Sequence, residues 1–149
     1  MNALYAAQRF VWRRFKPRTR GVKIMVFDPQ GKILLIRNSY GDSQAYVLPG
    51  GGVHPFERPE QAARREVQEE VHCGVENLNL LATHFSEREG KRDTIWLFAA
   101  RTDETPRIDP KEVAEAAFFA LDQLPERVSP ATARRIAEHQ GRRERTSAW

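Results

Sequence analysis

One short segment constrains this chain of 149 residues more than any other: three consecutive glycines, 50–52, followed by an acidic helical pattern. The acids Glu66, Glu69 and Glu70 stand at relative positions i, i+3 and i+4, so on a helix they are neighbours on one face. Like charges at this spacing repel by roughly 0.2–0.5 kcal/mol per pair. Acids kept together in this way predict a bound cation, and ligation by oxygen alone favours Mg²⁺ or Mn²⁺ over zinc.

The segment from Gly51 to Cys73 closely resembles the Nudix box, written G-x5-E-x7-R-E-U-x-E-E-x-G-U with U an aliphatic residue. The positions that match at the required spacing are Gly51, Glu57, Arg65, Glu66, Val67, Glu69 and Glu70. Two positions depart from the family pattern. His72 stands where the family has glycine, and Phe56 stands where many members have glycine. The resemblance implies the Nudix fold, an α+β architecture (an α/β/α sandwich) with a mixed β-sheet between helices.

Length and composition predict a single domain over residues 1–149. Hydrophobic residues make up 40% of the chain, which is enough for a packed core. No apolar run approaches about 18 residues, so we expect no membrane partner. The single cysteine, Cys73, excludes an internal disulfide and favours a cytoplasmic location. The polar segment 141–149 is expected to be a flexible tail.

Apolar periodicity and turn residues predict the order of elements. Strands are expected at 22–27, 32–37, 46–48, 75–86, 93–101 and 114–121, and helices at 3–15, at 59–72 and from Ser129 onward. Pro59 suits the first turn of the middle helix, and its predicted buried stripe is Ala63, Val67 and Val71. Arg58 is a poor N-cap, so we expect a weak start to this helix. Residues 87–92 are expected to form a loop between two strands.

Charge is unevenly distributed along the chain. Residues 1–23 hold seven Lys and Arg residues and no acid, which leaves 17 basic and 20 acidic residues in the remainder. The basic character therefore belongs to an N-terminal helix or arm, residues 1–20. Its ordinary interpretation is a solvated basic helix that packs through its apolar residues. The alternative is a surface that binds nucleic acid or an anionic membrane.

The resemblance implies an activity as well as a fold, namely metal-dependent hydrolysis of a pyrophosphate bond in a nucleoside diphosphate linked to another moiety. A divalent cation would neutralise the diphosphate and activate water. The metal ligands implied in this way are Glu66, Glu69, Glu70 and the Gly51 carbonyl. Either Glu69 or Glu66 would also take a proton from the attacking water.

Other residues receive supporting roles from the same resemblance. Arg65 and Glu57 are expected to pair and to orient the glycine loop and the acidic face of the helix. Outside the box, Glu112 is the first candidate for a further metal ligand, and Glu115 is the second.

Substrate contacts are expected around the glycine loop. The candidates are Lys23, Arg37, Tyr46, Gly50 and Gly52. Lysine and arginine bind phosphate, and a tyrosine ring stacks on a base. It stays open whether Lys23, Arg37 and Tyr46 are instead ordinary strand-surface residues.

Residues outside the box do not single out a substrate, so a small nucleoside di- or triphosphate is the default expectation, for a monomer or a homodimer. One alternative is removal of pyrophosphate from the 5′ end of RNA, with the basic arm gripping the strand. A second alternative is a non-catalytic nucleotide-binding sensor. The retained acids of the box argue against that second alternative.

Overall fold

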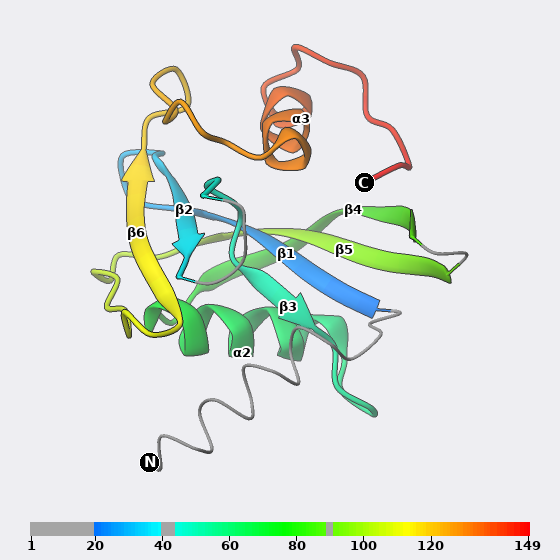
Figure 1. Ribbon diagram of the computed structural model, residues 1–149, viewed down its shortest axis with the longest axis horizontal. Coiled ribbons are helices and arrows are strands. Elements are labelled where there is room, and N and C mark those ends of the chain that lie inside the picture. Colours follow the sequence, from blue (N-terminus) through cyan, green and yellow to red (C-terminus); the bar gives the residue numbers. More distant parts are fainter. Residues whose placement is uncertain (1–19, 40–43, 89–90) are drawn as a thin grey trace.

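The computed structural model of the chain describes residues 20–39, 44–88 and 91–149. These ranges form a mixed β-sheet with α2 against one face and α3 against the other, which confirms the predicted α+β architecture (Figure 1). The elements are β1 (Arg20–Phe27), β2 (Ile33–Asn38), β3 (Gly50–Gly52), α2 (Pro59–Val71), β4 (Glu76–Arg88), β5 (Lys91–Arg101), β6 (Val113–Phe119) and α3 (Pro130–His139). The helix expected at 3–15 lies outside the described residues. No helix in the described ranges has the length and apolarity needed to cross a membrane.

The central strand β1 organises the sheet, whose strand order is β4-β5-β1-β2-β6 with β3 paired to β1. β1 runs parallel to β5 and antiparallel to β2 and β3. Its pairing with β2 is at its far end, Phe27 opposite Ile33, whereas its first half pairs with the glycine strand, from Gly21 opposite Gly52 to Lys23 opposite Gly50. The glycine strand is therefore fixed against the middle of the sheet.

The side chains of β1 pack in two hydrophobic cores, one on each face of the sheet, as expected for a strand buried on both faces. Val22 and Ile24 pack toward α2, in a core that includes Val67, whereas Met25 packs with Ile136 of α3. The predicted stripe of α2 is confirmed, since Ala63, Val67 and Val71 are all fully buried. One face of α2 is thus anchored to the sheet.

Both ends of α2 carry a residue that is uncommon at a helix cap, Arg58 at the start and His72 at the end. The side chain of Arg58 gives no cap, but its backbone N–H donates to Gln61 Oε1 at 3.0 Å, so the helix start is supported from within the first turn. His72 ends the helix in the left-handed conformation, φ 58° and ψ 36°, and its N–H donates to Gln68 O. Glycine adopts this conformation most easily, which explains why the family pattern has glycine there. Phe56, the other departure, also has a positive φ of 65°.

Two predicted boundaries were wrong. Tyr46 and Val47 form only isolated bridges, and the strand that follows is Gly50–Gly52. A run of glycines has no side-chain pattern to mark it as a strand, so its pairing with β1 is a tertiary effect. Of the loop expected at 87–92, the four described residues belong to β4 and β5, with Glu87 opposite Arg92 and Arg88 opposite Lys91.

The segment after α3 differs from the flexible tail that its polar composition predicted. It returns to the edge strand β4, where Phe85 N–H donates to Ser147 O at 2.7 Å and Trp149 N–H donates to Phe85 O at 2.9 Å. Figure 1 shows this segment passing from α3 back toward β4. These bonds join residues far apart in sequence, so local composition gives no sign of them.

Candidate active site

The acids of α2 lie directly beneath the glycine strand. Glu66 is 2% exposed and Glu70 is 7% exposed, although both are carboxylates. A Cβ atom built on Gly51 would lie 2.5 Å from the Glu66 carboxyl group, so only glycine fits at that position with Glu66 in place. The backbone N–H of Gly50 donates to Glu70 Oε1 at 2.8 Å. The three consecutive glycines thus allow the backbone to approach two buried acids closely.

Arg65 ties the acidic face to the loop before the helix. Its guanidinium binds Glu57 through Nε to Oε2 at 2.8 Å and Nη2 to Oε1 at 2.9 Å, a bidentate pair. Nη1 donates to Glu66 Oε1 at 2.8 Å, and Nη2 donates to the Gly52 carbonyl at 2.8 Å. Glu69 Oε2 lies 3.5 Å from Nη1. The predicted pairing of Arg65 with Glu57 is therefore present, and it includes the glycine strand.

This network shifts the ionisation of its members. The hydrogen bond from Arg65 lowers the pKa of Glu57 to about 2 from an ordinary value of 4.5. Burial acts to lower the pKa of Arg65, but its hydrogen bond to Glu57 and the charge of Glu66 outweigh burial, so the net shift is upward. Both groups are consequently charged at neutral pH.

Replacement of Glu57 by Gln is expected to flatten the dependence of stability on pH. The folded pKa of Glu57 is depressed, so its pairing stabilises the fold fully above pH 4.5 and is lost as the pH falls toward about 2. Urea unfolding of both proteins from neutral pH downward measures the effect. The variant should be less stable at neutral pH and lose less in acid. Glu60→Gln, an exposed acid of the same helix, serves as the control and should leave the curve unchanged. Parallel curves for Glu57→Gln and the wild type would contradict the pairing.

The donor types of this region fit a hard divalent cation, because the acids offer carboxylate oxygens and the glycine strand offers backbone carbonyls. The close approach of Gly51 to Glu66 provides a cradle that any side chain would fill. Within the described residues, however, no three His, Cys, Asp or Glu side chains gather as a group that could hold a metal ion. Glu66 Oε1 accepts from Arg65 Nη1, and Glu70 Oε1 accepts from the Gly50 N–H.

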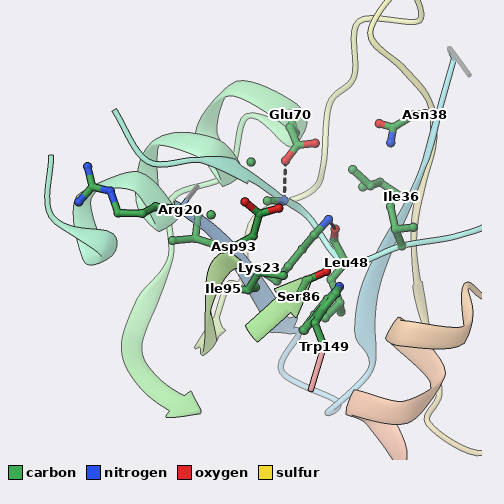
Figure 2. A pocket seen from close by; sticks show the side chains of 15 residues that line it. Arg20, Lys23, Ile36, Asn38, Leu48, Glu70, Ser86, Asp93, Ile95 and Trp149 are labelled. Carbon is green, nitrogen blue, oxygen red and sulfur yellow. Dashed lines mark hydrogen bonds between the residues drawn. The ribbon is translucent and has the colours of Figure 1, made fainter. Parts of the chain in front are cut away.

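A pocket of about 390 Å³ opens beside the acids, between β1, β3, β5 and the segment before β3. Four of the candidate residues that were predicted from the sequence line this pocket, namely Lys23, Gly50, Gly51 and Glu70. Figure 2 shows Glu70 bonded to the strand at one end, with Lys23 extending along the pocket. Lys23 Nζ also donates to the Leu48 carbonyl at 3.2 Å, which fixes its direction. A lysine beside these amides and acids is suited to phosphate.

Arg37 and Tyr46 belong to a separate polar group and do not line this pocket. Arg37 pairs with Glu115 through Nη2 to Oε2 at 3.4 Å and donates to Gln44 Oε1 at 2.7 Å. The hydrogen bond between Tyr46 and Glu115, together with burial, raises the pKa of the Tyr46 hydroxyl. These residues are thus joined to one another across β2 and β6.

The remaining candidates do not line the pocket. Gly52 does not line the pocket, but its carbonyl accepts from Arg65. The backbone of Glu112 contacts Asp109 and Ser39. Among the described residues, its hydrogen bonds are made through the backbone to these two residues and not to the acids of α2. Cys73 is fully buried in the core next to α2, and burial raises the pKa of its thiol, which suits a packing role.

Sequence reasoning missed several residues of the pocket. These are Arg20, Asn38, Ser86, Asp93, Ile95 and Trp149, together with apolar residues of β1 and β2. Asp93 stands opposite Ser86 in the β4–β5 pair, and both residues lie at the ends of the strands that were expected there. Nothing in the local sequence around Trp149 indicates its position in the pocket.

Comparison with known proteins supports the same family. An RNA pyrophosphohydrolase of Photorhabdus laumondii is 40% identical over 62 residues, 42% of this chain and 34% of that protein. An isopentenyl-diphosphate Delta-isomerase of Streptomyces griseus is 31% identical over 121 residues, 72% of this chain and 60% of that protein. The chain therefore spans less than two thirds of either relative.

Solved structures agree with the fold. A MutT NUDIX hydrolase from Burkholderia pseudomallei superposes with a TM-score of 0.71 at 27% identity, covering 81% of this chain and 97% of that one. A MutT protein from Methanosarcina mazei superposes with a TM-score of 0.68 at 22% identity, covering 89% of this chain and 99% of that one. The family model of the NUDIX domain matches residues 17–139. The chain belongs to the Nudix hydrolase family.

Proposed function

We propose that this chain hydrolyses a pyrophosphate bond in a small nucleoside di- or triphosphate, or in a nucleoside diphosphate linked to another moiety, with Mg²⁺ or Mn²⁺. The observation that supports this most directly is the meeting of two features at the glycine strand. Gly50 and Gly51 contact the buried acids of α2 and also line a pocket that contains Lys23. A phosphate group in that pocket would lie between the ammonium group of Lys23 and the acids of α2.

In this proposal the metal ligands are Glu66, Glu69, Glu70 and the Gly51 carbonyl. The bound cation supplies neutralisation of the diphosphate and a lowered pKa of its water. Lys23 holds a phosphate oxygen from the other side of the pocket. Phosphoryl transfer requires positioning and charge neutralisation more than covalent chemistry by the protein, and these residues supply both.

Glu69 is the better candidate for the general base. Its side chain is 25% exposed, whereas that of Glu66 is 3% exposed and lies 2.8 Å from Arg65 Nη1. A base must reach the water that it deprotonates, so exposure favours Glu69. Arg65 is then a positioning residue, because it holds Glu66, the Gly52 carbonyl and Glu57 at fixed distances.

Removal of pyrophosphate from RNA is the second candidate, favoured by the relatives named RNA pyrophosphohydrolase. Arg20, the first described residue, lines the pocket and could meet a second phosphate of a strand. A volume of about 390 Å³ nevertheless lies near the lower end of the range for small-molecule sites, about 300–1,000 Å³. Such a space suits one nucleotide unit, either a free nucleotide or the first nucleotide of an RNA.

The proposal predicts that the purified chain releases phosphate products from a nucleotide panel only when Mg²⁺ or Mn²⁺ is added. The panel should contain nucleoside di- and triphosphates, sugar-linked nucleoside diphosphates, 5′-triphosphate RNA and isopentenyl diphosphate. Product analysis by chromatography identifies the bond that breaks. Preference for RNA over free nucleotide would favour the second candidate, and isomerisation of isopentenyl diphosphate without hydrolysis would overturn the assignment.

A further inference from the structure

The segment that follows α3 is held on the sheet by a buried arginine. Arg135 is 1% exposed, and its Nη1 donates to the Ala148 carbonyl at 2.7 Å and to His84 Nδ1 at 3.0 Å. Arginine is only a donor, so His84 must accept through Nδ1 and carry its proton on Nε2. Burial and the charge of Arg135 lower the pKa of His84, which agrees with a neutral ring.

A buried acid completes this attachment. Glu138 pairs with Arg135 through Oε1 to Nη2 and Oε2 to Nε, both at 3.0 Å, and Glu138 Oε1 also accepts from the Thr146 N–H at 3.2 Å. Arg134 Nη2 donates to the backbone oxygen of Trp149 at 2.9 Å. A buried ion pair is costly unless it is well hydrogen bonded. Here its bonds are directed at the backbone of 146–149, so the pair fixes the path of that segment.

The result is a defined position for the indole ring of Trp149. The Arg135 guanidinium lies 5.2 Å from the ring centroid, and the His84 ring meets it edge-on at 5.5 Å. Both groups thus contact the indole ring. Trp149 remains partly exposed, and it lines the pocket together with Ser86 and Ile95.

The pocket therefore has two chemically different ends. Figure 2 shows Glu70 and its bond to the glycine strand at one end, Trp149 and Ser86 at the other, and Lys23 between them. Ile95 and Leu48 line the same pocket, and Leu48 is 1% exposed. A polar end and an aromatic, apolar end in one space suit a ligand that carries phosphates on one side and a flat ring on the other.

We propose that Trp149, fixed by Arg135 and His84, receives the base of the nucleotide and so determines which diphosphates this site accepts. This inference rests on the proposed function, because it places the diphosphate at the end near Glu70. An indole ring stacks on any base, since every base has a π-face. The expected preference is therefore for diphosphates with a planar ring, over those without one, rather than for one particular base.

Replacement of Trp149 by Ala should raise KM about tenfold for the nucleotide selected by the panel, as expected from the loss of one stacked base. The kcat should change by less than about twofold, because the acids are untouched. For a sugar diphosphate that lacks a base, Trp149→Ala should have the same KM as the wild type. Trp149→Phe retains a flat ring and should recover most of the affinity. A rise in KM of equal size for both substrates would overturn the inference, because it would show that Trp149 only supports the pocket wall.

A matched control separates binding from folding. Ser147→Ala changes an exposed side chain two residues away and should leave both KM values unchanged. Thermal unfolding of every variant shows whether the segment remains attached. If Trp149→Ala unfolds at a much lower temperature, the comparison is made with Trp149→Phe and Trp149→Leu, which both retain a large apolar side chain and differ in aromaticity.

Fluorescence provides a readout that does not depend on hydrolysis. AMP and GMP should quench the tryptophan emission of the wild type, ribose 5-phosphate should not, and the quenching should disappear in Trp149→Phe. If the panel shows no hydrolysis but this pattern holds, the proposed reaction fails and the base site stands. If hydrolysis is normal and AMP leaves the emission of Trp149 unchanged, the base site fails alone.

Discussion

Glu69→Gln is expected to reduce metal-dependent hydrolysis by about a thousandfold or more while the protein remains folded. A general base contributes roughly 10²–10⁴-fold, and Gln can neither take a proton nor carry the charge that a metal ligand provides. The fold should persist, because the side chain is 25% exposed and its distance to Arg65 Nη1 is 3.5 Å, the longest in that network. The kcat and the thermal unfolding midpoint measure the two effects.

Two comparisons make this result specific. Glu60→Gln removes an exposed acid from the first turn of the same helix and should retain full activity. Glu66→Gln should lose activity and also stability, because it removes one of the charged partners of Arg65 at a site that is 2% exposed. Full activity in Glu69→Gln would refute its assignment.

A titration with Mg²⁺ distinguishes the two roles proposed for Glu69. If Glu69 acts mainly as a ligand, a high concentration of Mg²⁺ restores part of the rate of Glu69→Gln. If it acts as the base, saturating metal leaves the rate low, and the variant loses the acidic limb of the pH profile of kcat/KM. The second outcome is expected from the greater exposure of Glu69.

The parts of this site that were predicted correctly depend on residues that are close to one another in the sequence. The spacing of the acids on α2 and the pairing of Arg65 with Glu57 depend on helical periodicity and a short connection, so sequence reveals them. The start of α3 was also predicted from local sequence. Ser129 accepts from the Thr132 N–H at 3.2 Å, and Pro130 occupies the first position of the helix, as predicted.

The parts that were missed depend on pairing between distant residues. Arg37 seemed close to the glycine loop in chain order, but its position opposite Glu115 in the β2–β6 register places it in another group. Trp149 reaches the pocket because Arg135 and Phe85 bind its segment, and neither contact leaves a trace in local composition. Strand register and long-range docking set these positions, and periodicity reports neither.

The glycine strand itself can be tested through Gly50. A Cβ atom at this position would lie 2.1 Å from the Val22 carbonyl oxygen and 3.0 Å from its carbonyl carbon. Both atoms belong to the backbone of β1, which is paired along its length with β5 and cannot easily move. At Gly51, by contrast, the obstructing atoms belong to the side chain of Glu66. Gly50→Ala must therefore displace β3 from the sheet.

The expected cost of Gly50→Ala is about 3 kcal/mol, from steric overlap and from the lost amide bond to a buried carboxylate. In a domain of this size that lowers the unfolding midpoint by roughly 10 °C. Hydrolysis should fall with it even below the unfolding temperature, because the Gly50 N–H that holds Glu70 at 2.8 Å moves away.

Gly21→Ala is the matched control, because Gly21 lies in the same sheet, opposite Gly52, and its added Cβ would meet the Gly51 carbonyl at 3.4 Å. That distance is close to ordinary van der Waals contact, so the control should lose less than about 1 kcal/mol and keep its activity. The difference between the two variants isolates the close approach of β3 to β1. Equal stability and activity in both would show that the glycine strand does not lie against Val22, and the site built on it would have to be redrawn.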